Sequence, residues 1–102
     1  MAISTADRGL LILTSLAEGP KHGYALMQDI AGFAGVTLGP GTLYGALSRL
    51  EARGLITSLP SAERRRPYTL TSAGSEALER ELSENAKIAR IGLRRLAENH
   101  QP

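Results

Sequence analysis

The spacing of apolar residues along the first half of the chain predicts three short helices. The first follows the cap-forming segment 4–7 and carries a leucine at every third residue from Leu10 to Leu16. It ends at Gly19-Pro20, because proline cannot continue a helical hydrogen-bond ladder. A second helix is expected at about 22–32, and the glycine-rich residues 32–41 are expected to form a connector. The apolar face of this second helix is formed by Leu26, Ile30 and Phe33.

The third helix, expected at 40–53, has an unusual outer face. It starts at Gly39-Pro40, where the missing N–H of proline costs nothing, and Gly54 is placed to end it. Opposite its leucines, this helix carries only small or polar residues, namely Gly41, Thr42, Tyr44, Gly45, Ser48 and Ala52. Glycine costs about 1 kcal/mol relative to alanine in a helix. The face therefore indicates a weak helix or, the interpretation we favour, a helix whose backbone must approach another surface closely.

Two short segments that favour β structure then predict a hairpin. Residues 55–59 form the first, and residues 68–71 form the second, in which Tyr68 and Leu70 share a face. The connecting segment has a local charge of +2, from Glu63 and three consecutive arginines. These arginines are Arg64, Arg65 and Arg66.

Residues 71–97 predict one long helix with an apolar stripe. Thr71 or Ser72 can cap it, and about 26 residues would span about 39 Å. Three short helices are too small to cover such a stripe. The helix therefore either folds back on its own domain or, as we expect, pairs with the same helix of a second copy in a homodimer. The stripe consists of Leu78, Leu82, Ala86, Ala89, Leu93 and Leu96.

Charge divides the long helix into two parts. Residues 76–84 carry four acids and one base, a net −3, whereas residues 87–95 carry four bases and no acid, a net +4. Antiparallel pairing would bring opposite charges together, and parallel pairing would place like charges together. The pattern favours an antiparallel pair, but exposed ion pairs contribute little, so both orientations stay open.

Length and composition exclude several classes of function. The 102 residues suffice for one compact domain of about 100 residues. The absence of cysteine excludes disulfides, thiolate catalysis and cysteine-ligated zinc. The two histidines, His22 and His100, stand in no catalytic or metal-binding spacing, so we expect no enzyme, metal or cofactor. The apolar run 10–16 is too short to span a membrane. We expect a cytoplasmic protein.

The order of three helices, a hairpin and a helix is typical of a winged helix-turn-helix protein. We therefore expect a mainly α fold with a small β-hairpin, in which residues 1–71 form a DNA-binding domain. Residues 72–102 would form a dimerisation helix and a polar tail. In such folds the third helix enters the major groove and the hairpin reaches the flanking backbone or the minor groove. Arginines at the hairpin tip suit this role, because guanidinium groups pair bidentately with phosphates.

Several short motifs resemble the PadR family of bacterial transcriptional regulators, in order and spacing, over about residues 8–80. The resemblance implies a winged-helix repressor of the smaller subgroup that dimerises through its C-terminal helix and binds a two-fold operator. The motifs are His22-Gly23-Tyr24, Gly41-Thr42-Leu43-Tyr44, Leu47-Ser48-Arg49-Leu50-Glu51, Gly54-Leu55-Ile56, and Tyr68-Thr69-Leu70-Thr71 followed by Gly74.

Carried over residue by residue, the resemblance implies a DNA-binding surface. Tyr24 would contact phosphate, Thr42 and Tyr44 would face DNA from the third helix, and Arg49 is either structural or a phosphate contact. The complete expected set is Lys21, His22, Tyr24, Gly41, Thr42, Tyr44, Ser48, Arg49, Arg64, Arg65, Arg66 and Tyr68.

The chain departs from the family pattern at the hairpin turn and in its lack of tryptophan. The hairpin lacks the glycine often found at its turn. Some small members hold flat aromatic ligands between tryptophans at the dimer interface, and this chain has no tryptophan. An apolar pocket that includes Phe33 is the alternative place for a small effector.

The alternative function is a winged-helix module that binds protein rather than DNA, for which an acidic or apolar third helix would be expected.

Overall fold

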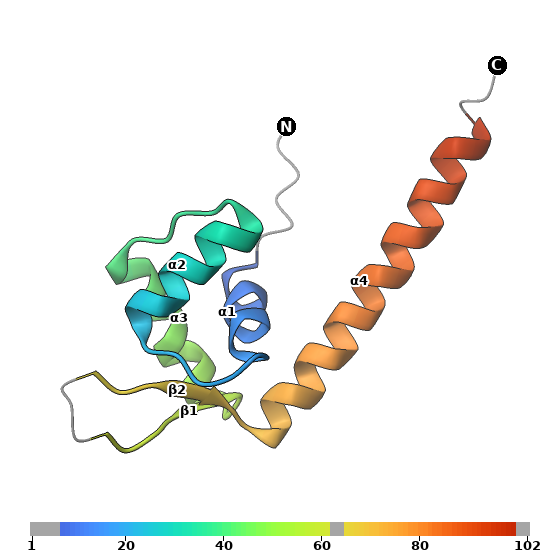
Figure 1. Ribbon diagram of the computed structural model, residues 1–102. Helices are drawn as coiled ribbons and strands as arrows, with labels where there is room; N and C mark the ends of the chain where they lie inside the picture. The colour runs from blue at the N-terminus through green and yellow to red at the C-terminus, as the bar shows by residue number, and fades with distance from the viewer. Residues whose placement is uncertain (1–6, 62–64, 100–102) are drawn as a thin grey trace.

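The computed structural model describes residues 7–61 and 65–99 (Figure 1). Three short helices are followed by a two-stranded antiparallel hairpin and a long C-terminal helix. This order confirms the predicted mainly helical, winged helix-turn-helix fold. The elements are α1 (Arg8–Leu16), α2 (Gly23–Ala34), α3 (Pro40–Ala52), β1 (Ile56–Ser58), β2 (Tyr68–Leu70) and α4 (Ser72–Asn99).

The ends of α3 follow from its own residues. Proline occupies its first turn after Gly39, as predicted. At the other end Gly54 adopts a φ of 75°, a left-handed conformation that glycine reaches without steric cost. The N–H of Gly54 then donates to the carbonyl of Glu51, and the N–H of Leu55 donates to that of Leu50, both at 3.0 Å. These two bonds form a Schellman motif, which confirms the predicted end at Gly54.

The start of α4 is also set locally. The hydroxyl of Thr71 accepts a hydrogen bond of 3.0 Å from the N–H of Gly74 and donates one of 2.6 Å to the carbonyl of Gly54. Thr71 therefore caps α4 and ties its first turn to the end of α3. Of the two predicted caps, Thr71 and Ser72, the structure selects Thr71.

Helix α2 differs from its prediction in length and in its buried face. It continues past Gly32 to Ala34, because the left-handed residue that ends it is Gly35, with a φ of 66°. Glycine at position 32 lowers helix propensity but does not break the helix. Phe33, predicted to be on the buried face, is 49% exposed. It lies in the last turn of α2, one turn beyond the buried Ile30.

The core lies where α1, α2, α3 and the hairpin meet. The leucines of α3 at positions 43, 47 and 50 are buried, as their spacing predicted. Leu78 from the beginning of α4 is 5% exposed and joins the same cluster. The structure therefore places Leu78 in the core of its own domain, rather than on the exposed stripe. The most deeply buried apolar side chains are Ile12, Leu26, Ile30, Leu43, Leu47 and Ile56.

Beyond Leu78, α4 projects away from the domain (Figure 1). The radius of gyration is 16.1 Å, whereas a compact domain of 100 residues has about 13 Å. The prediction that α4 does not fold back on its domain is confirmed. None of the helices in the described part of the chain is long and apolar enough to cross a membrane. The large apolar side chains that α4 leaves exposed are Leu82, Ile88, Leu93 and Leu96.

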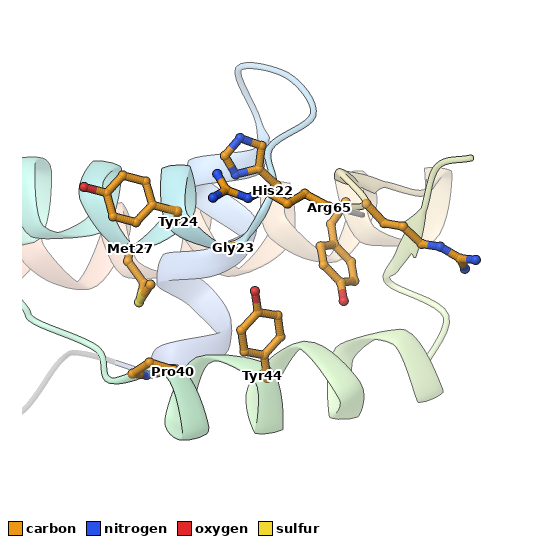
Figure 2. A pocket seen from close by; sticks show the side chains of 9 residues that line it. His22, Gly23, Tyr24, Met27, Pro40, Tyr44 and Arg65 are labelled. Atoms are coloured by element: carbon orange, nitrogen blue, oxygen red, sulfur yellow. The ribbon is translucent and has the colours of Figure 1, made fainter. Parts of the chain in front are cut away.

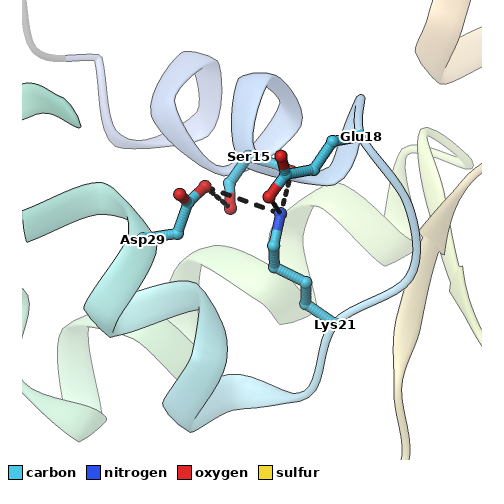
Figure 3. Close-up of polar contacts among 4 residues, drawn as sticks. All are labelled: Ser15, Glu18, Lys21 and Asp29. Carbon is cyan, nitrogen blue, oxygen red and sulfur yellow. Dashed lines mark hydrogen bonds and ion pairs between the residues drawn. The ribbon is translucent and has the colours of Figure 1, made fainter. Parts of the chain in front are cut away.

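A polar network joins α1 to α2 beneath the connection between them (Figure 3). The hydroxyl of Ser15, a residue only 2% exposed, donates to a carboxylate oxygen of Asp29 at 2.6 Å. The ammonium group of Lys21 donates to the carbonyl of Ser15 and lies 2.7 Å from the carboxylate of Glu18 and 3.5 Å from that of Asp29. The positive charge of Lys21 is therefore held inside the domain.

This network predicts a pH-dependent contribution of Asp29 to stability. The hydrogen bond from Ser15 and the charge of Lys21 outweigh partial burial and hold the pKa of Asp29 below its ordinary value of 3.8. A lowered pKa stabilises the fold above the unfolded-state pKa, and this stabilisation disappears as the pH falls through the folded-state pKa. Asp29→Asn should therefore lower the melting temperature at pH 7, and the difference from the wild type should shrink below about pH 4. Thermal unfolding of both proteins between pH 2.5 and 7 measures this, and a pH-independent difference would contradict it.

Candidate nucleic-acid interface

A cleft of about 490 Å³ lies between the beginnings of α2 and α3 and the hairpin (Figure 2). Its lining comes from three segments that are far apart in the sequence. Six of the lining residues belong to the predicted DNA-binding set, so the fold brings half of that set together. They are His22, Tyr24, Tyr44, Arg65, Arg66 and Tyr68; the others are Gly23, Met27 and Pro40. We call this site the tyrosine–arginine cleft.

Backbone pairing places the hairpin beside the start of α2. Strands β1 and β2 pair antiparallel, with Ser58 opposite Tyr68 and Ile56 opposite Leu70. Lys21 then pairs with Tyr68 on the other side of β2, through hydrogen bonds of 3.0 and 2.8 Å. The residue that follows Lys21 in the chain is His22. This single β-bridge places the residue before His22 beside the start of β2, and His22 lines the same cleft as Arg65 and Arg66.

Gly23 lets α3 approach the start of α2. A Cβ atom at this position would lie 2.3 Å from the hydroxyl oxygen of Tyr44, so a larger residue would displace that side chain. Figure 2 shows Tyr44 extending from α3 toward Gly23, between Tyr24 and Arg65. The two phenols remain accessible, with Tyr24 56% and Tyr44 49% exposed. Gln28, one turn further along α2, donates to the Tyr24 hydroxyl at 3.0 Å.

The cleft combines hydrogen-bond donors with positive charge. Burial, together with the charge of Glu51 and the neighbouring Tyr44, raises the pKa of Tyr68 above its ordinary value of 10.0, although Arg66 opposes the shift. The phenol of Tyr68 is therefore neutral near pH 7 and can donate. Within the described residues, Nδ1 of His22 is buried without a hydrogen-bond partner. Neutral hydroxyls beside guanidinium groups suit an anion such as a phosphate.

The outer face of α3 is flat and open, as its sequence predicted. Gly41, Thr42 and Ser48 are exposed on the side away from the core. A Cβ atom at Gly41 would meet nothing within 4 Å, and one at Gly45 would meet only a guanidinium nitrogen of Arg49, at 3.5 Å. Another surface can therefore approach the α3 backbone closely along this face.

The remaining predicted residues lie elsewhere. The ammonium group of Lys21 is turned into the network with Ser15 and Asp29 and does not line the cleft. Arg49 lies in a separate groove on the other side of α3. Arg64 lies outside the described residues. Among the residues that the structure describes, no group of three or more histidine, aspartate or glutamate side chains could hold a metal ion.

Comparison with known sequences identifies the family. Residues 12–80 match the profile of the Transcriptional regulator PadR-like family. The chain belongs to the PadR-like family. The matched segment contains every residue that lines the tyrosine–arginine cleft. The resemblance seen in the sequence motifs is thereby confirmed, and this PadR-like protein belongs to a family of transcriptional regulators.

Of two similar proteins, one is a transcriptional regulator and the other is uncharacterized. The chain is 38% identical over 84 residues to the transcriptional regulator Rv3488 of Mycobacterium tuberculosis, with 79% of this chain and 78% of that protein covered. It is 49% identical over 85 residues to an uncharacterized 37.1 kDa protein in transposon TN4556 of Streptomyces fradiae, with 83% of this chain covered. The chain spans only a quarter of that protein.

A solved structure shows the same fold. A PadR family transcription regulator from hypervirulent Clostridium difficile superimposes with a TM-score of 0.78 at 30% identity. The match covers 86% of this chain and 96% of that one. The long C-terminal helix and the hairpin of this PadR-like protein therefore belong to an architecture already known in the family.

Proposed function

We propose that this protein is a homodimeric, sequence-specific DNA-binding repressor of transcription. In this proposal α3 enters the major groove of a two-fold operator, and Arg65 and Arg66 contact the flanking backbone or the minor groove. The observation that carries the proposal is the tyrosine–arginine cleft. It brings phenols and guanidinium groups from α2, α3 and the hairpin together beside the open face of α3, and these groups suit phosphate. A regulator that binds chromosomal DNA would act in the cytoplasm.

The open face of α3 suits base contacts. The major groove is about 12 Å wide and admits one helix. Because Gly41 and Gly45 carry no side chain, the helix backbone can sit deeply in the groove. The hydroxyls of Thr42 and Ser48 can then donate to or accept from base edges, as either is allowed for serine and threonine. Phosphate contacts by the cleft would fix the register of the helix on the duplex.

The exposed part of α4 supports the dimer. Leu82, Leu93 and Leu96 are 41%, 68% and 58% exposed, so the described chain leaves most of the predicted stripe without an intramolecular cover. The opposite net charges of residues 76–84 and 87–95 would attract in an antiparallel pair. A two-fold dimer presents two copies of α3, which is the symmetry that a two-fold operator requires.

A groove at the beginning of α4 supports the proposal of a small apolar effector. An apolar groove of about 360 Å³ lies at the beginning of the stripe, where Ala17, Leu70, Leu78 and Leu82 contribute to its lining. Because Leu82 is also part of the stripe, a small apolar molecule bound there would lie next to the proposed dimer interface.

The proposal is tested by measuring DNA binding as a function of salt concentration. For duplexes selected from a random pool, the logarithm of the wild-type binding constant should fall linearly with the logarithm of the salt concentration. Arg66→Gln should reduce the slope by about 2 and weaken binding to all sequences about tenfold per contact, because each protomer of the proposed dimer loses one phosphate contact. Ser48→Ala should instead change which bases are selected.

A matched control is Arg80→Gln, which removes the same charge from an exposed position on α4. This variant should bind as the wild type does, since it lies outside the proposed interface. If the wild type binds no duplex at low salt, the proposal is wrong, and the protein-binding module becomes the better interpretation.

A further inference from the structure

A second basic groove lies against α3, on the side away from the tyrosine–arginine cleft. It has a volume of about 360 Å³ and is formed by the beginning of α1 and the second half of α3. Arg8 comes from α1, Arg49 comes from α3, and Arg53 is the residue that directly follows α3; Arg8 and Arg53 are in none of the family motifs. We call this site the triple-arginine groove. Its lining is Asp7, Arg8, Gly9, Ala46, Arg49, Leu50 and Arg53.

The three guanidinium groups of this groove are available to a ligand. All three arginines are exposed. Within residues 7–61 and 65–99 no carboxylate forms an ion pair with any of them. The acidic residue of the groove, Asp7, uses a carboxylate oxygen to accept the N–H of Gly9 at 2.9 Å and so caps α1. The groove therefore has a formal charge of +2, from three arginines and one aspartate.

The position of the groove around α3 matches the geometry of a helix in the major groove. Successive residues of a helix are about 100° apart. Gly41, Gly45 and Ser48 therefore point outward, with Tyr44 on one edge of this outer face and Arg49 and Arg53 on the other. Tyr44 lines the tyrosine–arginine cleft, and the two arginines line the triple-arginine groove. The open face of α3 is thus flanked by phosphate-binding chemistry on both sides.

Arg49 links the groove to the outer face itself. One of its guanidinium nitrogens lies 3.5 Å from the position that a Cβ atom at Gly45 would occupy. The side chain therefore folds back along α3 and lies over the glycine. This contact places positive charge at the rim of the face that is proposed to approach DNA.

We propose that Arg8, Arg49 and Arg53 bind the sugar–phosphate backbone of the second DNA strand, across the major groove from the hairpin. This inference rests on the proposed function. A helix in the major groove lies between two backbones, one of which the tyrosine–arginine cleft would contact. The triple-arginine groove faces the other. Each half-site would then be held from both strands, with α3 fixed between them.

The test compares the double variant Arg8→Gln/Arg53→Gln with the wild type on one selected duplex. Loss of two phosphate contacts from each protomer, four in the proposed dimer, should reduce the slope of log affinity against log salt by about 4. The bases selected from a random pool should not change, because phosphate contacts carry no base information. Hydroxyl-radical footprinting should show that the double variant loses protection of one strand at each half-site. Arg66→Gln should lose protection of the other strand.

Two further variants separate a phosphate contact from general effects. Arg80→Gln/Lys87→Gln removes the same charge from the side of α4 opposite its stripe, and it should retain the wild-type slope and footprint. Arg8→Lys/Arg53→Lys keeps the charge and should restore most of the slope. If the wild type binds DNA and the Gln variant matches it in slope and footprint, this inference fails while the proposed function stands. If the wild type binds no duplex, both fail.

Discussion

Replacing Gly74 with alanine is expected to destabilise the protein by about 3 kcal/mol, the upper part of the range for overpacking. A Cβ atom at this position would lie 1.9 Å from the carbonyl oxygen of Leu55 and 2.9 Å from its carbonyl carbon. A backbone carbonyl cannot rotate away as a side chain can. Leu55 is also fixed on both sides, because its N–H donates to the carbonyl of Leu50 and its carbonyl accepts from the N–H of Thr71. Relief would require α4 to move away from the start of the hairpin.

Thermal unfolding at a fixed protein concentration measures this effect. A loss of about 3 kcal/mol should lower the melting temperature by about 12 °C or more in a domain of this size. Gly92→Ala is the matched control in the same helix, because a Cβ atom there meets nothing within 4 Å. It should leave the melting temperature unchanged or raise it, since alanine is the better helix former. Equal melting temperatures for the two variants would contradict the close contact.

The double variant Leu93→Glu/Leu96→Glu is expected to convert the proposed dimer into a monomer and to weaken operator binding about 100-fold. Burial of one leucine contributes about 1.5–3 kcal/mol, and each substitution occurs twice in a two-fold interface. Both leucines are more than half exposed in the single chain, so the fold of the domain should not depend on them. The expected loss therefore comes from association alone.

Light scattering at micromolar concentration, followed by operator binding, measures both effects. Arg80→Glu changes the net charge by the same two units but lies on the side of α4 away from the stripe, so it should remain dimeric. A wild-type protein that is monomeric under these conditions would overturn the dimer. A dimeric double variant would instead show that the stripe is not the interface.

The helix ends were predictable because they depend on residues close together in the chain. Proline at position 40, the left-handed Gly54 and the capping bond from the N–H of Gly74 to Thr71 each involve backbone groups no more than five residues away. The same reasoning placed the end of α2 too early. Gly32 and Gly35 are equally plausible stops by composition, and only the conformation of Gly35 shows which one ends the helix.

The burial of individual side chains depended on tertiary packing. Lys21 and Arg66 are both basic residues beside the proposed interface, but the carboxylates of Glu18 and Asp29 draw the ammonium group of Lys21 inward. Leu78 belongs to the same periodic stripe as Leu82. Leu78 packs into the core because α4 begins against the domain, and Leu82 lies one turn beyond that contact. Periodicity identifies the apolar face of a helix, but it does not show how far along the helix that face packs against the rest of the domain.

The order of the elements, the apolar faces of α1 and α3, the open outer face of α3 and the arginines of the hairpin could all be predicted from the sequence. These features rest on spacing within single segments, where helix geometry and short hydrogen-bonded turns decide the outcome. In contrast, the packing of the elements brings Tyr24, Tyr44 and Arg66 into one cleft and Arg8 and Arg53 into another. Those residues are 20 or more positions apart. Their approach depends on how α1, α2, α3 and the hairpin pack around a common core, which no local pattern specifies.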